Sequence, residues 1–267
     1  MDIFGGEAMA DGYDSARPPL HGLIMERVAL ALHWAADPAG SSGAPTRTVV
    51  DIGCGAGAST VAARPWADRL VGLDPAPTMV KRAARRHRDA RFGVATGLAV
   101  PIRSGAVDVL VAAGSLNFMD LAAFRAEADR VLAPDGVVIA YDFATGRRSP
   151  ADPTLAAAYD EFAARWPRPV ANRHGVDPEV LVAAGFALHI HAASVLTLTM
   201  TADDYTRYLM TETNVAGAVE RGQSRDEIER WCRRRFAPAF AAPRPVEFEC
   251  WYAVAEPGVS ADHVCEQ

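Results

Sequence analysis

Short runs of apolar, mostly β-branched residues recur along the first half of the chain, and segments with helical periodicity lie between them. The runs cover residues 48–53, 70–74, 90–95, 107–114 and 136–143. Helical spacing of apolar residues starts at 58 and recurs at 77–88 and 120–132. Uninterrupted apolar runs are typical of strands buried on both faces, and helical crossovers join strands that run parallel. Residues 46–145 therefore predict an α/β fold with a parallel sheet covered by helices on both faces.

The second half of the chain is less regular, but its pattern extends the same sheet. Alternating apolar and polar residues at 186–200 predict one long strand or two short ones, and 246–256 predicts a last strand. With the five parallel strands, these make a seven-stranded, mostly parallel sheet that ends in a hairpin with a helical insertion. The predicted helices lie at 155–166, 177–185 and 201–209 and within 224–240, with Asp177 and Thr201 as N-caps.

The residues before the sheet form a separate segment. Residues 1–22 are polar and predict a loosely packed leader, 23–36 predict a helix, and 37–46 have the composition of a loop. Met1–Ala10 carries acidic residues and glycines instead of a basic start and an apolar run. We therefore do not expect it to be a signal peptide.

Composition narrows the class of protein. The chain has 267 residues, 50% of them hydrophobic, and a formal net charge of −6. This charge argues against a nucleic-acid or anionic-membrane partner, and no apolar run reaches the roughly 18 residues that span a bilayer. The basic run at 81–91 is expected to be a solvated helix face. The cysteines are scattered, which indicates neither a zinc site nor a disulfide framework and favours a reducing, cytoplasmic location.

One turn carries candidate binding chemistry. The sequence VVDIGCGAG places Asp51, Gly53, Gly55 and Gly57 between a predicted strand and a predicted helix. Glycines there allow positive φ and let a ligand approach the backbone, where helix N-terminal amides favour a negative group. Asp74 follows Gly57 by seventeen residues and ends the second strand, where an acid can accept hydrogen bonds from both hydroxyls of a ribose.

The same turn is compatible with two alternative interpretations. Gly53, Gly55 and Ala58 fit the dinucleotide pattern GxGxxA. However, Asp51 would repel a pyrophosphate, whereas it suits a ligand that carries an ammonium group. The turn could also be a tight connection in an α/β protein that binds nothing.

At these residues the chain resembles the class I S-adenosylmethionine-dependent methyltransferases, in particular the small-molecule, type 11-like group. The first motif is VVDIGCGAGAST at 49–60, and VGLDPAPTMVKRA at 71–83 is similar to the second-strand motif. Residues 94–120 resemble the third and fourth strands of that family, and RVLAPDGVVIAYDF at 130–143 resembles its turn into the fifth strand. The resemblance implies a Rossmann-like sheet and S-adenosylmethionine as cofactor.

The resemblance also implies site residues. Asp51 and the glycine turn would surround the methionine part, Asp74 would hold the ribose, and Met79 would pack on the adenine. Tyr13 and Arg17 resemble a Tyr…Arg-Pro segment that folds over the cofactor, with Arg17 on its carboxylate. The implied cofactor contacts are Tyr13, Arg17, Asp51, Gly53, Cys54, Gly55, Gly57, Asp74, Pro75, Met79, Thr96, Gly97, Leu98 and Ala113.

The chain departs from the family pattern at three places. Thr96 stands where a family Asp binds the adenine amine, and Asp135–Gly136 replaces a Gly-Gly turn. Asn117 replaces a histidine beside the transferred methyl, which removes a common candidate base. The candidate catalytic residues are Asn117, Tyr13 and Asp142, of which Asp142 is either a substrate contact or base at the end of the fifth strand or only a cap.

We therefore expect methyl transfer from S-adenosylmethionine to a small molecule, giving S-adenosylhomocysteine, with no metal, by a monomer or homodimer. The cofactor supplies the activation, so the protein mainly aligns the nucleophile and excludes water. The alternatives are an enzyme that breaks the aminobutyrate arm and releases methylthioadenosine, or a binding protein without catalysis.

The segments that are not needed for the sheet predict a division of the chain. Residues 1–45 would form a leader and helix that act as a lid, and 46–267 the methyltransferase domain, with lid inserts at about 146–185 and 201–243. Further polar and aromatic candidates for this lid are His21, His174, Tyr205, Tyr208, Glu212 and Asn214.

Overall fold

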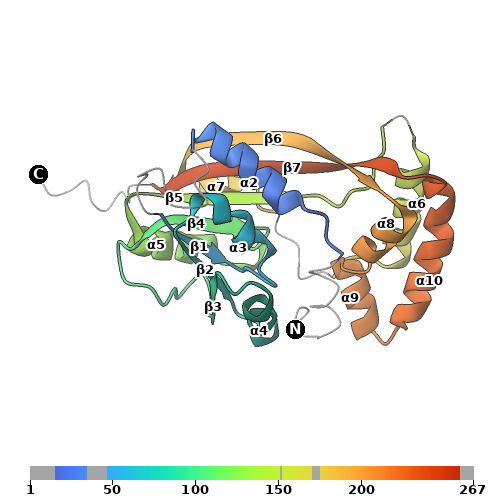
Figure 1. Ribbon diagram of the computed structural model, residues 1–267, viewed down its shortest axis with the longest axis horizontal. Helices are drawn as coiled ribbons and strands as arrows, with labels where there is room; N and C mark the ends of the chain where they lie inside the picture. The colour runs from blue at the N-terminus through green and yellow to red at the C-terminus, as the bar shows by residue number, and fades with distance from the viewer. Residues whose placement is uncertain (1–15, 35–46, 151, 170–174, 259–267) are drawn as a thin grey trace, which may run out of the picture. The chain divides into compact units, whose positions relative to one another are not determined.

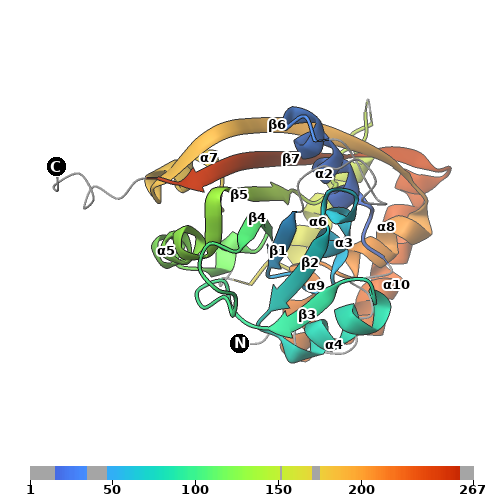
Figure 2. The same ribbon diagram turned by 60° about the vertical axis from the view of Figure 1, so that its left-hand side comes forward.

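A seven-stranded sheet in the order β3-β2-β1-β4-β5-β7-β6 organises the chain. The computed structural model describes residues 16–34, 47–150, 152–169 and 175–258. The strands are β1 (Thr48–Ile52), β2 (Arg69–Asp74), β3 (Arg91–Val94), β4 (Val107–Ala113), β5 (Leu132–Phe143), β6 (Phe186–Met200) and β7 (Arg244–Pro257). Strands β1 to β5 pair in parallel, and Figure 2 shows their carboxyl ends at one edge. The predicted fold class is confirmed, and residues 186–200 form one long strand.

Helices cover both faces of the parallel strands. Helix α3 (Ala58–Ala62) packs on β1, β2 and β4, and α4 (Pro77–Arg86) packs on β2 and β3. Figure 2 shows α5 (Leu121–Val131) on the opposite side of the strands. The central strands are buried, because β1 and β4 contribute side chains such as Val50 and Leu110 to the core. This burial explains why their sequences are mostly apolar, apart from Asp51 and Asp108.

The chain divides into two compact units. The sheet unit comprises His21–Asp142, His174–Ala193 and Trp251–Gln267. The insert unit comprises Met1–Leu20, Phe143–Arg173 and Ser194–Cys250. Helix α7 (Pro178–Ala183), expected within a lid insert, belongs to the sheet unit. The assignment of the other insert segments to a lid stays a prediction.

The insert unit has an aromatic core of its own. Its helices are α6 (Thr154–Arg165), α8 (Ala202–Leu209), α9 (Thr213–Glu220) and α10 (Arg225–Phe236), seen in Figure 1. The buried ring of Tyr205 lies 5.1 Å from Phe236 and 4.9 Å from Phe240, measured between ring centroids. Its hydroxyl donates to the Gly146 carbonyl over 2.6 Å. Tyr205 and Tyr208 are therefore packing residues here, although the sequence offered them as lid candidates.

Two helices begin at the N-cap residues that the sequence predicted. Asp177 caps α7 by accepting from the Val180 amide, and Thr201 forms a capping box with Asp204 at α8. The first helix, α2, covers Leu20–Ala31 instead of 23–36 and begins directly after Pro18 and Pro19. The α-helical part of α10 ends at Phe236, and a 3₁₀ turn containing Pro238 follows.

Helix α9 was not predicted from the sequence. It contains Gly217 and Asn214, which are weak helix formers. A Cβ at Gly217 would lie 2.6 Å from the Pro169 ring, so close packing requires glycine there. Tertiary packing rather than intrinsic propensity thus stabilises α9.

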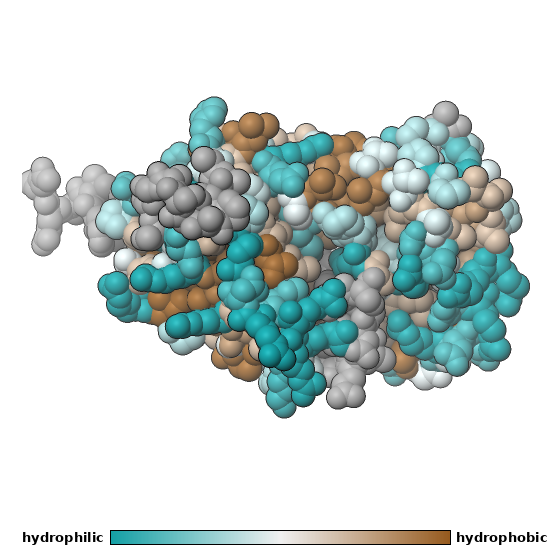
Figure 3. Space-filling view, viewed as in Figure 1, coloured by the Kyte–Doolittle hydropathy of each residue, from teal (hydrophilic) through white to brown (hydrophobic). Residues whose placement is uncertain are grey.

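The charged face of α4 is solvated, as the sequence predicted. Lys81, Arg85 and Arg86 are exposed, while Met79, Val80 and Ala83 are buried. Figure 3 shows hydrophilic side chains gathered over α4. Among the described residues, no helix is long and apolar enough to cross a bilayer.

Candidate functional site

The glycine turn after β1 has the backbone that the sequence predicted. Gly53, Gly55 and Gly57 have φ values of +71°, +53° and +95°, in the left-handed region that favours glycine. The amides of Gly53 and Cys54 both donate to the Leu73 carbonyl, over 2.7 and 3.1 Å. These bonds fasten the turn to the end of β2, which carries Asp74.

Gly53 also lies against the end of β4. A Cβ on Gly53 would lie 2.5 Å from the Cβ of Ser115, which is closer than carbon atoms can pack. The Ser115 hydroxyl donates to the Ile52 carbonyl over 2.6 Å, so this serine is fixed in place. Glycine is therefore required at position 53 for both its φ and its lack of a side chain.

Asp51 is fully buried beneath this turn. Its Oδ2 accepts from the hydroxyls of Ser59 and Thr60, over 2.7 and 2.6 Å. Its Oδ1 is also buried and makes no hydrogen bond within the part of the chain that the structure describes. Burial raises the pKa of Asp51 from 3.8 to about 6, and the charge of Asp74 adds to this shift. A buried carboxylate with one unsatisfied oxygen is suited to a cationic ligand.

Asp74 holds the turn through backbone amides. Its Oδ2 accepts from Gly55 over 2.9 Å, and its Oδ1 accepts from Ala76 over 2.8 Å. A carboxylate offers about four acceptor sites, so backbone amides and ligand hydroxyls can share it. The carboxylate thus couples the glycine turn of β1 to the end of β2.

The other predicted cofactor contacts surround this centre. Met79 is buried in α4, Pro75 is exposed beside Asp74, and Ala113 ends β4. Thr96 and Leu98 are exposed in the segment after β3. All these residues, with Gly97 and Cys54, belong to the sheet unit, and their roles toward a cofactor stay predictions.

The surroundings of Gly97 and Cys54 explain why a glycine and a cysteine stand at these positions. A Cβ on Gly97 would lie 2.6 Å from the Ile52 side chain, which brings residues 96–98 to the end of β1. Burial raises the pKa of the Cys54 thiol far above its usual range. Cys54 therefore stays protonated and acts as a small packing residue, not a nucleophile.

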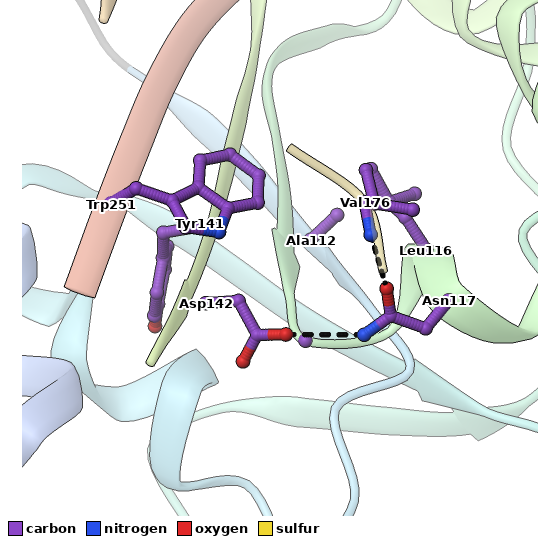
Figure 4. A pocket seen from close by; sticks show the side chains of 8 residues that line it. Ala112, Leu116, Asn117, Tyr141, Asp142, Val176 and Trp251 are labelled. Atoms are coloured by element: carbon purple, nitrogen blue, oxygen red, sulfur yellow. Dashed lines mark hydrogen bonds between the residues drawn. The ribbon is translucent and has the colours of Figure 1, made fainter. Parts of the chain in front are cut away.

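Asn117 and Asp142 meet at the carboxyl ends of β4 and β5. Figure 4 shows Asn117 between Asp142 and Val176: its Nδ2 donates to Asp142 Oδ2 over 3.1 Å, and its Oδ1 accepts from the Val176 amide over 2.8 Å. These bonds fix both ends of the amide. Asn117 and Asp142 border a small pocket. Its lining residues are Ala112, Gly114, Leu116, Asn117, Tyr141, Asp142, Val176 and Trp251.

We expect Asn117→Ala to lower the free energy of unfolding by about 1–2 kcal/mol, because Val176 and Asp142 each lose a hydrogen-bond partner. Urea unfolding at neutral pH measures this change. Asn117→Asp restores an acceptor for Val176 but places a second carboxylate beside Asp142. Its destabilisation should therefore grow as pH rises and both acids ionise, and equal loss at acidic and neutral pH would contradict the arrangement.

The sequence did not identify Tyr141 as part of this region. The Nδ1 of His21, on α2, is hydrogen-bonded to the Tyr141 hydroxyl at 2.9 Å. Burial raises the pKa of Tyr141, and the charges of Asp51 and Asp142 add to the shift. A tyrosine two residues before the end of β5 was the available signal, but its partner lies 120 residues away in the chain.

Of the predicted residues Tyr13, Arg17 and His174, the structure describes only Arg17. Tyr13 and His174 lie outside the described residues. Arg17 belongs to the insert unit, where its Nη2 lies 3.7 Å from Glu212 Oε1. Arg168 and Thr145 both donate to the other oxygen of this buried carboxylate, over 3.2 and 2.8 Å. A role for Arg17 at the cofactor carboxylate thus stays a prediction.

Comparison with known proteins agrees with this geometry. Residues 50–140 match the family described as "Methyltransferase domain". The demethylmenaquinone methyltransferase of Corynebacterium kroppenstedtii is 32% identical over 139 residues, which cover 52% of this chain and 58% of that one. The ubiquinone biosynthesis O-methyltransferase of Methylobacterium sp. is 31% identical over 151 residues, which cover 52% and 57%. The chain thus spans little more than half the length of these curated relatives.

Solved structures show the same fold. A candidate type II methyltransferase from Anaeromyxobacter dehalogenans superposes with a TM-score of 0.59 at 22% identity, over 79% of this chain and 89% of that one. A methyltransferase candidate from Bacillus halodurans superposes with a TM-score of 0.51 at 14% identity, over 87% and 98%. With the strand order and the glycine turn, the family match leads to one conclusion: residues 50–140 of this chain are a methyltransferase domain.

Proposed function

We propose that this protein transfers a methyl group from S-adenosylmethionine to a small organic acceptor and releases S-adenosylhomocysteine. The observation that carries the proposal is the buried Oδ1 of Asp51, which makes no hydrogen bond within the described residues. It lies at the carboxyl edge of the parallel strands, where ligands of such sheets bind. A nucleoside with an ammonium-bearing arm would give this oxygen a positively charged hydrogen-bond donor.

The residues present fit that cofactor. Asp51 would bind the ammonium group, and Asp74 would accept from the ribose hydroxyls while it keeps the Gly55 amide. The apolar side chains of Met79 and Leu98 would contact the adenine. When bound, S-adenosylmethionine supplies an electrophilic methyl carbon, and the protein has to orient the acceptor and exclude water.

The acceptor end of the site would lie at Asn117 and Asp142. The Asn117 amide fixes the orientation of the Asp142 carboxylate through its 3.1 Å bond. Asp142 Oδ1 can then accept a proton from an acceptor hydroxyl or amine, while Asn117 itself cannot act as a base. Relatives named for demethylmenaquinone and for ubiquinone biosynthesis support a small organic acceptor. A covering role for Tyr13 and for the insert segments belongs to the same proposal.

Three further parts of the proposal come from the sequence. They are the absence of a metal requirement, a cytoplasmic location and a monomeric or homodimeric state. In the described part of the chain, no three His, Cys, Asp or Glu side chains converge as metal ligands. Activity unchanged after treatment with a chelator tests the first of these, and a requirement for an added divalent cation would contradict it.

We expect Asp74→Ala to weaken S-adenosylhomocysteine binding by about 100-fold, because hydrogen bonds from two hydroxyls to a carboxylate are lost together. Isothermal titration calorimetry measures the affinity. Asp129→Ala, at an exposed acid on α5, is the matched control and should bind like the wild type. Equal affinity of Asp74→Ala and wild type would refute the site.

Product analysis then tests the reaction. Purified protein is incubated with S-adenosylmethionine and a set of small quinols, phenols and amines, and products are identified by mass spectrometry. S-adenosylhomocysteine together with a methylated acceptor supports methyl transfer. Methylthioadenosine would instead show cleavage of the aminobutyrate arm, and cofactor binding with neither product would indicate a binding protein.

A further inference from the structure

The insert unit contains a cavity, open to solvent, that the proposed methyl transfer does not use. Its volume is about 910 Å³, within the range of small-molecule pockets. The walls come from the end of α6, from the turn at residues 222–224 and from one face of α10. All of these residues belong to the insert unit.

Two tryptophans form one wall, and hydrogen bonds hold one of them, Trp166. The rings of Trp166 and Trp231 meet edge to face, with centroids 5.0 Å apart. Trp166 Nε1 donates to Gln223 Oε1 over 2.6 Å, and Asn214 Nδ2 donates to the Trp166 carbonyl over 2.6 Å. Trp166 is buried, whereas Trp231 is only partly buried and can offer its ring to a ligand. This wall is apolar and suited to a planar partner.

The remaining walls are positively charged. Arg165, Arg230 and Arg234 line the cavity, against the single carboxylate of Glu227. Two more positive than negative charges therefore face this space, in a chain whose net charge is −6. Arg165 is held over the Trp166 ring, 5.3 Å from its centroid.

The arginines of α10 differ in whether they form ion pairs, according to the helix face on which they lie. Arg233 and Arg235, outside the cavity, form ion pairs with Glu229 and Glu161. Arg230 and Arg234, one helical turn apart, form no ion pair with any residue that the structure describes. The acids of the unit thus neutralise one set of guanidinium groups and leave the set at the cavity available.

We propose that this cavity binds an organic anion with an aromatic ring, its carboxylate, sulfonate or phosphate on Arg230 and Arg234 and its ring against Trp231. Guanidinium groups bind such oxyanions through paired N–H donors, and they retain their charge at any physiological pH. The proposal concerns the insert unit alone and does not depend on methyl transfer.

The test uses 2-naphthoate as the probe and its neutral analogue 2-naphthamide, with the full-length protein. Calorimetry should show naphthoate binding that weakens at least tenfold in the Arg230→Gln/Arg234→Gln double variant, since two charged contacts are removed. The amide should bind at least tenfold more weakly than the anion. Quenching of tryptophan fluorescence that disappears in Trp231→Leu places the ring at this wall.

Arg233→Gln/Arg235→Gln is the matched control, with the same change of charge on the same helix but outside the cavity. It should bind naphthoate within about threefold of the wild type, because distant exposed charges are screened by salt. Thermal unfolding of each variant verifies that the helices have formed. No naphthoate binding by the wild type, equal loss in both double variants, or equal affinity for the neutral amide would overturn the proposal.

Discussion

Replacement of Asp51 by Asn should stabilise the ligand-free protein above about pH 7 and at the same time weaken binding of S-adenosylmethionine and S-adenosylhomocysteine. Most substitutions of buried residues destabilise a protein, so this combination is distinctive. It is the expected result for a carboxylate whose charge is costly in the free protein and useful only when a cation binds.

The stability effect follows from the direction of the pKa shift. The folded protein binds the Asp51 proton more tightly than the unfolded chain, since the pKa is about 6 rather than 3.8. Stability therefore falls as pH rises from about 4 to about 6, and this loss persists at higher pH. A shift of about two pKa units corresponds to about 3 kcal/mol, which is the upper bound on what the charge costs. The amide of the variant would keep an oxygen for the Ser59 and Thr60 hydroxyls, so we expect a net gain of about 1–2 kcal/mol.

The binding effect has the opposite sign. An ammonium group requires ionised Asp51, so wild-type affinity should fall as pH decreases below about 6, while the variant should lack this dependence. Urea unfolding at several pH values and calorimetry with S-adenosylhomocysteine measure the two effects. Asp120→Asn, at the exposed N-cap of α5, is the control, because Asn also caps helices and neither property should change. Undiminished binding by Asp51→Asn would show that Asp51 has no role at the cofactor.

The sequence predicted the backbone of the site well because that backbone depends on local chemistry. Apolar runs define the buried strands, and the glycines at 53, 55 and 57 mark positions where φ is positive. The parallel direction of β1 to β5 could also be predicted, since helical crossovers join strands that run parallel. Asp51 was identified by its place just before the glycine turn, and Asp74 by its place at the end of the second strand.

Interactions between residues far apart in sequence could not be predicted in the same way. The Tyr141–His21 bond spans 120 residues, and the Glu212–Thr145 bond spans 67. That Asp51 Oδ1 accepts no hydrogen bond within the described residues is also a three-dimensional property, because Ser59 and Thr60 both donate to the other oxygen, Oδ2. Motifs thus locate the site, but packing determines which of its polar atoms remain available for a ligand.

Gly53→Ala should destabilise the protein by about 3 kcal/mol and abolish cofactor binding. Alanine at a φ of +71° costs about 1–2 kcal/mol, and insertion of a methyl group into a packed site costs about 1–3 kcal/mol. The new Cβ would lie 2.5 Å from the Cβ of Ser115, which cannot swing away as the end of a long side chain can. The end of β1 has to move, and Asp51 moves with it.

Gly55→Ala separates the two causes. Gly55 has a φ of +53°, but a Cβ there would meet no atom within 4 Å. This variant should lose only the conformational part, about 1–2 kcal/mol. Urea unfolding of both variants, and of Gly53→Ala/Ser115→Gly, completes the comparison. Removal of the Ser115 side chain should recover at least about 1 kcal/mol of the Gly53→Ala loss in a double-mutant cycle. Equal destabilisation at positions 53 and 55, with no coupling to Ser115, would mean that the turn does not pack against β4. The contact between Gly53 and Ser115 would then not be what holds the glycine turn over Asp51.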